Sequence, residues 1–296
     1  MNYLQELEHE AIYIIREAYA QFHNPVILFS GGKDSIVVAH LTLKAFSPFK
    51  NRIPLLHIDT GHNFTETIQF RDAFVRKFNF NLLIANVQDT IDQGKVLEDQ
   101  GNYNSRNKIQ SVTLLDAIEN YKIDCALGGG RRDEEKARAK ERIFSHRDIF
   151  GQWDPKNQRP EIWGLFNGRK LDGEHFRVFP ISNWTERDVW EYIRRERIQL
   201  PSLYFSHMRQ VIYRDNTWIP LSSFIRLKKD EQIQEKKIRF RTLGDITLTG
   251  GIISEAITID QVIDELELSS NSERGNRADD KTSDFSMEDR KKEGYF

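Results

Sequence analysis

The hexapeptide Ser-Gly-Gly-Lys-Asp-Ser at residues 30–35 constrains the fold more than any other stretch of this sequence. It follows an apolar run at 25–29, short enough for a buried parallel strand, and precedes a segment at 36–45 long enough for a helix. Glycines in such a turn let the backbone approach a ligand, and the amides at a helix N-terminus attract negative charge. The lysine adds a positive charge and the two serines add hydroxyl donors. The segment therefore predicts a phosphate or pyrophosphate site.

Two other interpretations of this segment are weaker. It is not a P-loop, because Asp34 follows Lys33 where that motif requires Ser or Thr, and no glycine lies five residues before Gly32. It could also be an ordinary helix N-cap after a glycine turn. The strand before it and the helix after it favour the anion site. The hexapeptide resembles the PP-loop of the ATP pyrophosphatases, which cleave ATP between the α and β phosphates.

Composition excludes several classes of protein. With 43 Lys and Arg against 45 Asp and Glu, the net charge of −2 argues against broad nucleic-acid binding. The single cysteine, Cys125, excludes a disulfide framework and a cysteine-based zinc site, and it fits a reducing cytosol. The eight histidines show no metal-ligand spacing. We find no signal peptide and no apolar run as long as a membrane span, so we expect a cytoplasmic protein with no nucleic-acid or membrane partner.

Strands and helices alternate along most of the chain, which predicts an α/β fold with a doubly wound parallel sheet. The resemblance of residues 30–35 to the PP-loop implies that this fold is of the adenine-nucleotide α-hydrolase (PP-loop) type. In such sheets ligands bind beyond the carboxyl ends of the strands, where the loops after Phe29, Ile58 and Leu127 would meet. The expected strands are 25–29, 52–59, 81–86, 124–127 and 177–180. The expected helices are 1–24, 36–45, 65–77, 112–121, 186–195 after a Thr185 cap, and 258–268.

The alternation weakens beyond Pro201, and this predicts a division of the chain. We expect a nucleotide-binding α/β domain at 1–215, a smaller C-terminal region with short strands at 216–268, and a charged tail at 269–296.

The segment from 131 to 142 is almost wholly charged. Its plainest interpretation is a solvated helix with ion pairs such as Glu134 with Arg138. Arg131 and Arg132 differ, because they directly follow the glycine turn 128–130 at a strand end. We expect these two arginines to face ligand oxygens.

Several motifs occur here in one order and register, and together they carry a resemblance over nearly the full length. They are residues 30–35, 57–62, 128–142, 153–160, 178–186, 239–244 and the ending 286–296. This set is similar to the small, ATP-binding subunit of bacterial sulfate adenylyltransferase. Three positions depart from that family: Gly130 replaces a usual alanine, Asp245 stands where many members have cysteine, and Gly275 lies one position early.

The resemblance implies an enzyme that joins sulfate to the α-phosphorus of ATP and releases pyrophosphate. Sulfate is already a dianion, so the attack needs no general base, and the sequence shows no triad, Cys–His pair or carboxylate dyad at a recognisable spacing. The reaction needs alignment of two anions and stabilisation of charge on the phosphoryl oxygens.

Site residues follow from the motifs. We expect the PP-loop with Lys33 to hold the β and γ phosphates, and Arg131 and Arg132 to hold sulfate and the α-phosphate. Asp34 is the candidate for Mg²⁺, with a helix N-cap as the alternative, and Asp59 could bind ribose or metal. The predicted nucleotide contacts are Ser30, Gly31, Gly32, Lys33, Asp34, Ser35, Asp59, Gly128 and Gly129, and the weaker substrate candidates are Lys140, Arg142, Lys156 and Arg159.

A mixed phosphate–sulfate anhydride is a high-energy product, and this sequence has no Walker A motif for a second nucleotide. The resemblance implies a larger GTPase subunit whose GTP hydrolysis drives the reaction, so we expect a hetero-oligomer. The tail and the charged segment after Arg142 are the candidate contact surfaces.

Three rival functions remain open on the sequence. A phosphoadenosine-phosphosulfate reductase would need a reactive cysteine near the C-terminus, whereas Cys125 lies in a predicted buried strand. A tRNA-modifying PP-loop enzyme should show a basic face or paired cysteines. A nucleotide-sensing subunit without catalysis is opposed only by the completeness of the site.

Overall fold

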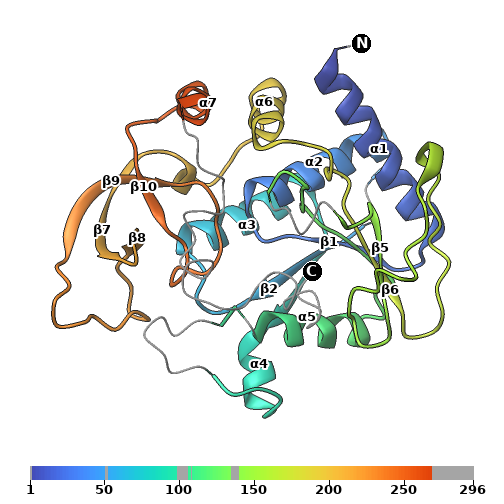
Figure 1. The fold of residues 1–296 in the computed structure, drawn as a ribbon, viewed down its shortest axis with the longest axis horizontal. Coiled ribbons are helices and arrows are strands. Elements are labelled where there is room, and N and C mark those ends of the chain that lie inside the picture. The colour runs from blue at the N-terminus through green and yellow to red at the C-terminus, as the bar shows by residue number, and fades with distance from the viewer. Residues whose placement is uncertain (1, 51–52, 99–105, 108, 135–139, 269–296) are drawn as a thin grey trace.

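A six-stranded sheet with helices on both faces forms the centre of the computed structural model, and a small barrel lies beside it (Figure 1). The structure describes residues 2–50, 53–98, 106–107, 109–134 and 140–268. The sheet strands are β1 (Pro25–Leu28), β2 (Leu55–Asp59), β3 (Leu82–Asn86), β4 (Cys125–Leu127), β5 (Phe144–Arg147) and β6 (His175–Val178). Their order is β3-β2-β1-β4-β6-β5, and all neighbours are parallel except β5 and β6. The predicted doubly wound α/β sheet is confirmed.

The helices lie close to their predicted positions. They are α1 (Tyr3–Gln21), α2 (Lys33–Phe46), α3 (Thr65–Phe78), α4 (Val87–Asp92), α5 (Ile109–Asn120), α6 (Glu186–Glu196) and α7 (Ile259–Leu268), with 3₁₀ turns η2 (Ile162–Gly164) and η3 (Ser202–Tyr204). Thr185 caps α6 as predicted: its side chain accepts from the amide of Asp188, whose carboxylate accepts from the amide of Thr185. Helix α4 was not predicted.

One strand was missed, and one expected strand is displaced. The predicted strand 177–180 is observed as β6, which begins earlier, at His175. Strand β5 runs antiparallel to it at the sheet edge, with Phe144 opposite Val178 and Arg147 opposite His175. Its four residues (Phe-Ser-His-Arg) have little strand propensity of their own, so the pairing depends on a partner far along the chain. The sheet is therefore parallel except at this edge.

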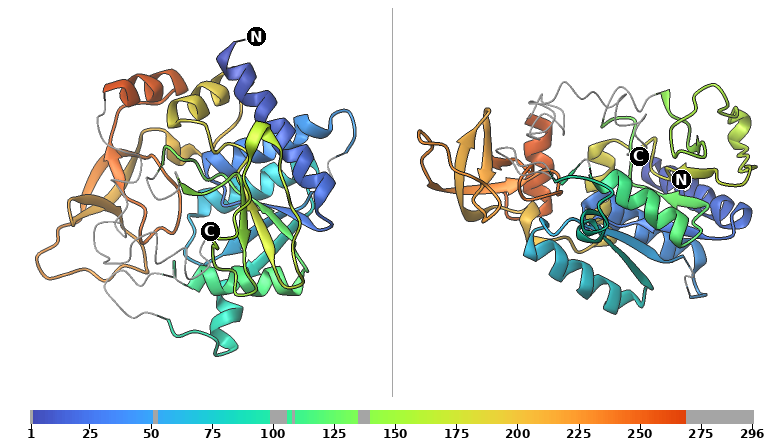
Figure 2. Two further views of the ribbon diagram at one scale, coloured as in Figure 1. Left: turned by 45° about the vertical axis from the view of Figure 1, so that its right-hand side comes forward. Right: turned by 90° about the horizontal axis from the view of Figure 1, so that it is seen from below.

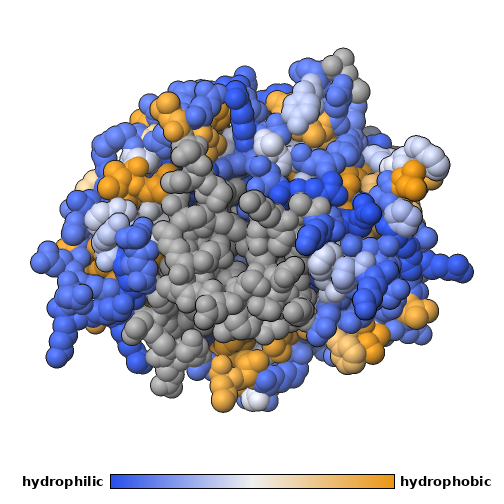
Figure 3. Space-filling view, viewed as in Figure 1, coloured by the Kyte–Doolittle hydropathy of each residue, from blue (hydrophilic) through white to orange (hydrophobic). Residues whose placement is uncertain are grey.

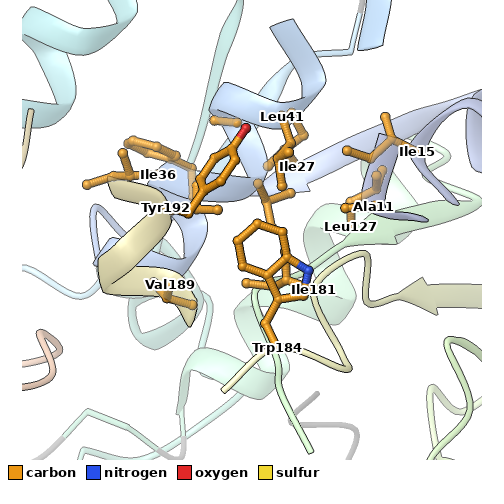
Figure 4. Packing of buried hydrophobic residues seen from close by; sticks show 14 of the residues in the cluster. Ala11, Ile15, Ile27, Ile36, Leu41, Leu127, Ile181, Trp184, Val189 and Tyr192 are labelled. Carbon is orange, nitrogen blue, oxygen red and sulfur yellow. The ribbon is translucent and has the colours of Figure 1, made fainter. Parts of the chain in front are cut away.

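The larger core packs α1, α2 and α6 on one face of the sheet. Buried residues of α1 recur at helical spacing, at Leu7, Ala11, Ile14, Ile15 and Ala18. Figure 4 shows Ala11 and Ile15 of this stripe beside Leu127 of β4, with Trp184 and Tyr192 closing the cluster from the α6 side. Burial of each large side chain stabilises the fold by about 1.5–3 kcal/mol, which anchors the elements that carry the loops of the site.

The opposite face of the sheet is covered mainly by α5. Leu114, Ala117 and Ile118 of this helix pack on Val26, Leu56 and Ala126 of the strands. Because side chains alternate along a strand, Ala126 faces α5 while its neighbours Cys125 and Leu127 face the larger core. The same alternation decides which residues of β6 face α5.

The C-terminal region is a closed barrel. Its strands are β7 (His207–Arg214), β8 (Thr217–Pro220), β9 (Gln234–Phe240) and β10 (Gly251–Ile253), in the order β10-β8-β7-β9. Both views in Figure 2 show the barrel to one side of the sheet, and α7 packs on α6 through an Arg194–Asp260 ion pair. The barrel begins at β7, before residue 216. The division into 1–215, 216–268 and 269–296 stays a prediction, and residues 269–296 lie outside the described part of the chain.

The described residues on the face shown in Figure 3 are mainly hydrophilic, and their apolar side chains form separate small groups. Among the described residues, no helix is long and apolar enough to cross a membrane.

Candidate functional site

The PP-loop, residues 30–35, connects β1 to α2 in a backbone conformation that depends on glycine. Gly31 has a φ of +77°, and a Cβ added there would lie 2.7 Å from Cγ2 of Thr67. Both its left-handed conformation and its surroundings therefore exclude a side chain. Gly32 is the N-cap residue of α2 and offers no side-chain cap of its own.

Groups around the PP-loop fix its shape from both sides. The Ser35 hydroxyl donates to the carbonyl of Gly32 at 2.8 Å, and the amide of Gly32 donates to Oγ of Ser30 at 3.2 Å. The amide of Lys33 donates to the hydroxyl oxygen of Tyr204 at 2.7 Å. Tyr204 was not predicted, because it lies far along the chain and reaches the loop only through the tertiary fold.

Asp34 lies between two buried cations. Its Oδ2 is 3.0 Å from Nζ of Lys33, and its Oδ1 accepts from Nε of Arg131 at 2.9 Å. Arg131 is 1% exposed and Lys33 is 0% exposed, whereas Asp34 keeps a quarter of its side chain accessible. Charge-assisted bonds of this kind hold both partners in place. The acid thus joins the start of α2 to the loop after β4.

The glycines after β4 permit this close approach. A Cβ on Gly129 would lie 2.8 Å from Cβ of Asp34 and 2.9 Å from its carbonyl carbon. Any side chain at Gly129 would push the loop after β4 away from α2. The glycine turn predicted at 128–130 therefore lets the loop pack closely against the start of α2, and it also leaves backbone groups exposed to the cavity.

A cavity of about 280 Å³ lies where the PP-loop, α5 and the carboxyl ends of the strands meet. Its apolar wall consists of Leu28, Leu56, Ile58 and Leu114. Its polar wall consists of Ser30, Gly32, Asp34, Ser35, Gly128, Gly129, Gly130 and Glu134. Further lining comes from Phe29, Asn107, Gln110, Ser111, Arg177, Phe179, Tyr204, Thr242, Leu243, Gly244 and Asp245. The predicted loops after Phe29 and Leu127 line this cavity at the carboxyl edge of the sheet, whereas the loop after Ile58 contributes no residue to its described lining.

Six of the predicted nucleotide contacts, Ser30, Gly32, Asp34, Ser35, Gly128 and Gly129, line this cavity, and the other predicted residues do not belong to its described lining. Gly31 and Lys33 belong to the same loop but do not line the cavity, and Lys33 is fully buried. Asp59 is turned toward its own connection, where its Oδ1 accepts from the amide of Gly61 at 2.8 Å and its Oδ2 lies 3.7 Å from Arg71.

The predicted cations occupy several different places. Arg132 donates to Oδ1 of Asn183 at 2.6 Å, beside the turn that precedes α6. Arg159 lies over the ring of Phe176, on the face of the sheet opposite the cavity. Lys140, Arg142 and Lys156 are exposed. The structure therefore does not gather these cations around the cavity.

Two lining features were missed by the sequence interpretation. The first is Arg177, a charged residue inside the short buried strand β6. The second is the segment 242–245, which follows β9 and reaches the loop after β2: the hydroxyl of Thr60 donates to Oδ1 of Asp245 at 2.6 Å. Asp245 was noted as a departure from a family pattern, and an arginine in an apolar strand was a usable signal.

His57, in the middle of β2, has a structural role. Nδ1 of His57 lies 2.8 Å from the carbonyl of Phe29 and donates to it. Burial lowers the pKa of His57, so the ring is neutral near pH 7 and bonds β2 to the start of the PP-loop.

The described residues do not fit a protein-held Mg²⁺ site. Both oxygens of Asp34 are engaged by cations, and no group of three His, Cys, Asp or Glu side chains within the described ranges is arranged to hold a metal. Magnesium normally needs oxygen ligands that are free to face it.

Known proteins resemble this chain over its full length. The phosphoadenosine phosphosulfate reductase domain family matches residues 24–251. Sulfate adenylyltransferase subunit 2 of Mycolicibacterium gilvum is 56% identical over 297 residues, which covers 100% of this chain and 95% of that protein. The protein of the same name from Mycobacterium tuberculosis is 54% identical with the same coverage.

Among solved structures, FMN adenylyltransferase of Candida glabrata in complex with ATP is similar with a TM-score of 0.51 and 13% identity. The similarity covers 93% of this chain and 87% of that one. At this identity the likeness concerns the fold alone.

Proposed function

This chain belongs to the sulfate adenylyltransferase subunit 2 family and carries the phosphoadenosine phosphosulfate reductase domain, and on that premise we propose how its cavity transfers the adenylyl group of ATP to sulfate. The observation that carries the proposal is the cavity itself. It joins an apolar wall of Leu28, Leu56, Ile58 and Leu114 to the glycine-rich PP-loop at the carboxyl edge of the sheet. A flat base fits the first surface and a diphosphate fits the second.

ATP is placed accordingly. The adenine lies against the apolar wall, and the β and γ phosphates lie at the N-terminus of α2, where the macrodipole and the hydroxyls of Ser30 and Ser35 favour negative charge. The α-phosphate then lies near Gly128 and Gly129, whose backbone allows close approach.

The reaction is a displacement at the α-phosphorus. A sulfate oxygen forms the new bond to phosphorus, and the bond from phosphorus to the oxygen bridging to the β-phosphate breaks, so that pyrophosphate leaves with that electron pair. Sulfate has no proton to lose at neutral pH, so the protein supplies alignment and charge rather than a base.

Lys33, Asp34 and Arg131 act as one unit in this proposal. The two cations are buried and neutralise Asp34, which would otherwise repel the phosphates across the cavity wall. Lys33 thereby supports the leaving diphosphate through Asp34, whereas the motif predicts that it holds the β and γ phosphates directly. Arg131 and Arg132 remain candidates for anion contact, Asp59 for a ribose contact, and Lys140, Arg142, Lys156 and Arg159 for the approach of substrate.

Mg²⁺ would enter with ATP, bound to phosphate oxygens, as is usual for nucleotide sites. Asp34 is the predicted protein contact, and that role requires one of its two ion pairs to open.

A second subunit provides the driving force in this proposal. Family membership as subunit 2 supports a hetero-oligomer, and a larger GTPase subunit would make the high-energy anhydride attainable. Reduced Cys125, the single cysteine of the sequence, supports a cytoplasmic location.

The reductase alternative is disfavoured by that same cysteine. Cys125 is 0% exposed in β4, and burial raises the pKa of its thiol well above the ordinary value. A nucleophilic cysteine is normally accessible and has a lowered pKa.

The decisive experiment mixes the purified chain with ATP, radiolabelled sulfate and the larger subunit, with and without GTP. We expect labelled adenosine 5′-phosphosulfate and pyrophosphate in equal amounts, with the yield raised by GTP. Full synthesis without GTP would contradict the coupling, and reduction of the sulfonucleotide without pyrophosphate release would favour the reductase.

A further inference from the structure

Arg177 is a buried cation in the lining of the cavity. It lies in β6, opposite Ala126 of β4 and Ser145 of β5, and it is 1% exposed. In the described part of the chain, none of its three guanidinium nitrogens has a hydrogen-bond partner. A guanidinium offers five N–H donors in a fixed plane, and burying it without acceptors is costly. The three nitrogens are closed to solvent in this conformation, but the residue belongs to the cavity lining, so a movement of the side chain into the cavity would present the donors to a ligand.

Among the described residues around Arg177, Arg147 opposes its charge and Glu141 partly compensates it. Arg147, on β5, is also buried, and its Nη2 donates to Oε1 of Glu141, which accepts from the hydroxyl of Ser145 as well. One carboxylate among these side chains therefore faces two guanidinium groups. The nearby ring of His175 adds no charge near pH 7, because burial and the two arginines hold its pKa well below the ordinary value.

The described lining of the cavity offers no other side-chain cation for a second anion. Its other charged side chains in the described lining are Asp34, Glu134 and Asp245, and Arg177 is the one basic side chain among them. The PP-loop accounts for the diphosphate and the apolar wall for the base, so neither provides a counter-charge for the incoming sulfate.

We propose that Arg177 binds the sulfate that attacks ATP, holding two of its oxygens through the planar guanidinium. This inference rests on the proposed function. The α-phosphate of ATP is also a tetrahedral oxyanion, and a bidentate arginine would suit either group. Sulfate is favoured because the nucleotide already has a backbone and hydroxyl cradle, whereas a free dianion must find a full positive charge within the cavity.

The first test compares steady-state kinetics of the full chain, assembled with its partner subunit, for Arg177→Met, Arg177→Lys and a matched surface control, Arg169→Met. Arg169 is exposed and is not in the described cavity lining. We expect Arg177→Met to raise the KM for sulfate by roughly 30-fold or more while the KM for ATP changes less than about threefold. Arg177→Lys should recover part of the loss, because it restores the charge without the fork.

The kinetic outcomes separate the two oxyanions. A raised KM for ATP with an unchanged KM for sulfate would assign Arg177 to the α-phosphate and overturn the inference. Unchanged values for both substrates would overturn it as well. If the wild-type complex makes no product at all, the proposed function fails, and the second test decides the inference on its own.

The second test needs no turnover. In the presence of ATP, sodium sulfate should raise the melting temperature of the wild-type chain and of Arg169→Met above that seen with sodium chloride of equal ionic strength. It should not do so for Arg177→Met. Without ligand, Arg177→Met should show a higher urea midpoint than wild type, because it removes a buried charge that is only partly compensated. A lowered midpoint with an intact sulfate response would mark Arg177 as structural.

Discussion

Two buried arginines, Arg131 after β4 and Arg177 in β6, differ in whether a carboxylate is bonded to them. Arg131, after β4, is bound to Asp34 and so joins the glycine turn to the start of α2. Arg177, in the next strand of the sheet, has no acceptor in the described part of the chain and lines the cavity. The first charge is used to build the site. The second is, in our proposal, kept for a ligand. Whether a buried cation has a structural role or is available to a ligand therefore depends on whether the fold provides it with an acceptor.

The largest effect on stability is expected from removal of the Asp34 carboxylate, which pairs with both Lys33 and Arg131. Asp34→Asn leaves Lys33 and Arg131 buried beside a neutral amide, and we expect the free energy of unfolding to fall by about 3–5 kcal/mol. Urea denaturation followed by tryptophan fluorescence measures it. The exposed Asp172→Asn serves as the control. A loss below about 1 kcal/mol would show that the two cations do not depend on Asp34.

Loss of the lysine should act on catalysis. Lys33→Ala unbalances the charge at the PP-loop, and we expect kcat/KM for ATP to fall about 100-fold, equivalent to ~2.7 kcal/mol. Lys44→Ala is a matched control, since Lys44 lies on the same helix and pairs with Glu196 away from the cavity. Full adenylyl transfer by Lys33→Ala would remove the pyrophosphate assignment.

Alanine substitutions at Gly31 and Gly94 test how tightly the PP-loop is packed. Gly31 and Gly94 have φ values of +77° and +69°, but a Cβ at Gly94 would have nothing within 4 Å, whereas one at Gly31 meets Thr67 at 2.7 Å. Both alanine substitutions should cost about 1 kcal/mol for the left-handed backbone. Gly31→Ala should cost a further ~1–2 kcal/mol for overpacking and should weaken ATP binding. Equal losses in thermal denaturation would contradict this account.

The pH dependence of sulfate binding tests the proposed role of Arg177. Burial, with the charge of Arg147, lowers the pKa of Arg177 to about 9. The guanidinium binds an anion only when protonated, so affinity is full below that pKa and is lost as pH rises through it. We expect the KM for sulfate to rise about tenfold between pH 8 and pH 10.

The other titratable groups near Arg177 do not produce this profile. His175 is already neutral, and the thiol of Cys125 stays protonated because its pKa is raised well above the ordinary value. Glu141 forms an ion pair with Arg147. Arg177→Met should give a high KM that does not vary with pH. A flat profile in the wild type would contradict the role of the guanidinium.

The smallest effect is expected at Asp59, in the connection after β2 and outside the described cavity lining. Asp59 accepts from the amide of Gly61, so Asp59→Ala should cost about 1 kcal/mol of stability with little change in the Kd for ATP. Calorimetric titration with ATP checks it. A tenfold weaker Kd with unchanged stability would instead support the ribose contact expected from the sequence.

Local features were predictable from the sequence because their causes lie within a few residues. The strand–turn–helix around the PP-loop and the Thr185 cap are of this kind. Strand β5 was not predictable, because its pairing with β6 is antiparallel and distant in sequence. The position of Arg131 at a strand end could be predicted, but its bond to Asp34 could not. Arg177 lines the cavity because β6 pairs with β4 and β5 in a register that turns this residue toward the cavity face. Such pairing between distant segments cannot be predicted from a local sequence pattern.

The hydrogen bond between Thr60 and Asp245 joins the loop after β2 to the segment between β9 and β10, so a connection of the barrel helps to shape the lining of the cavity. A chain with cysteine at 245 would lack the carboxylate that accepts from Thr60, and the contact between the two segments would be weakened beside the nucleotide site.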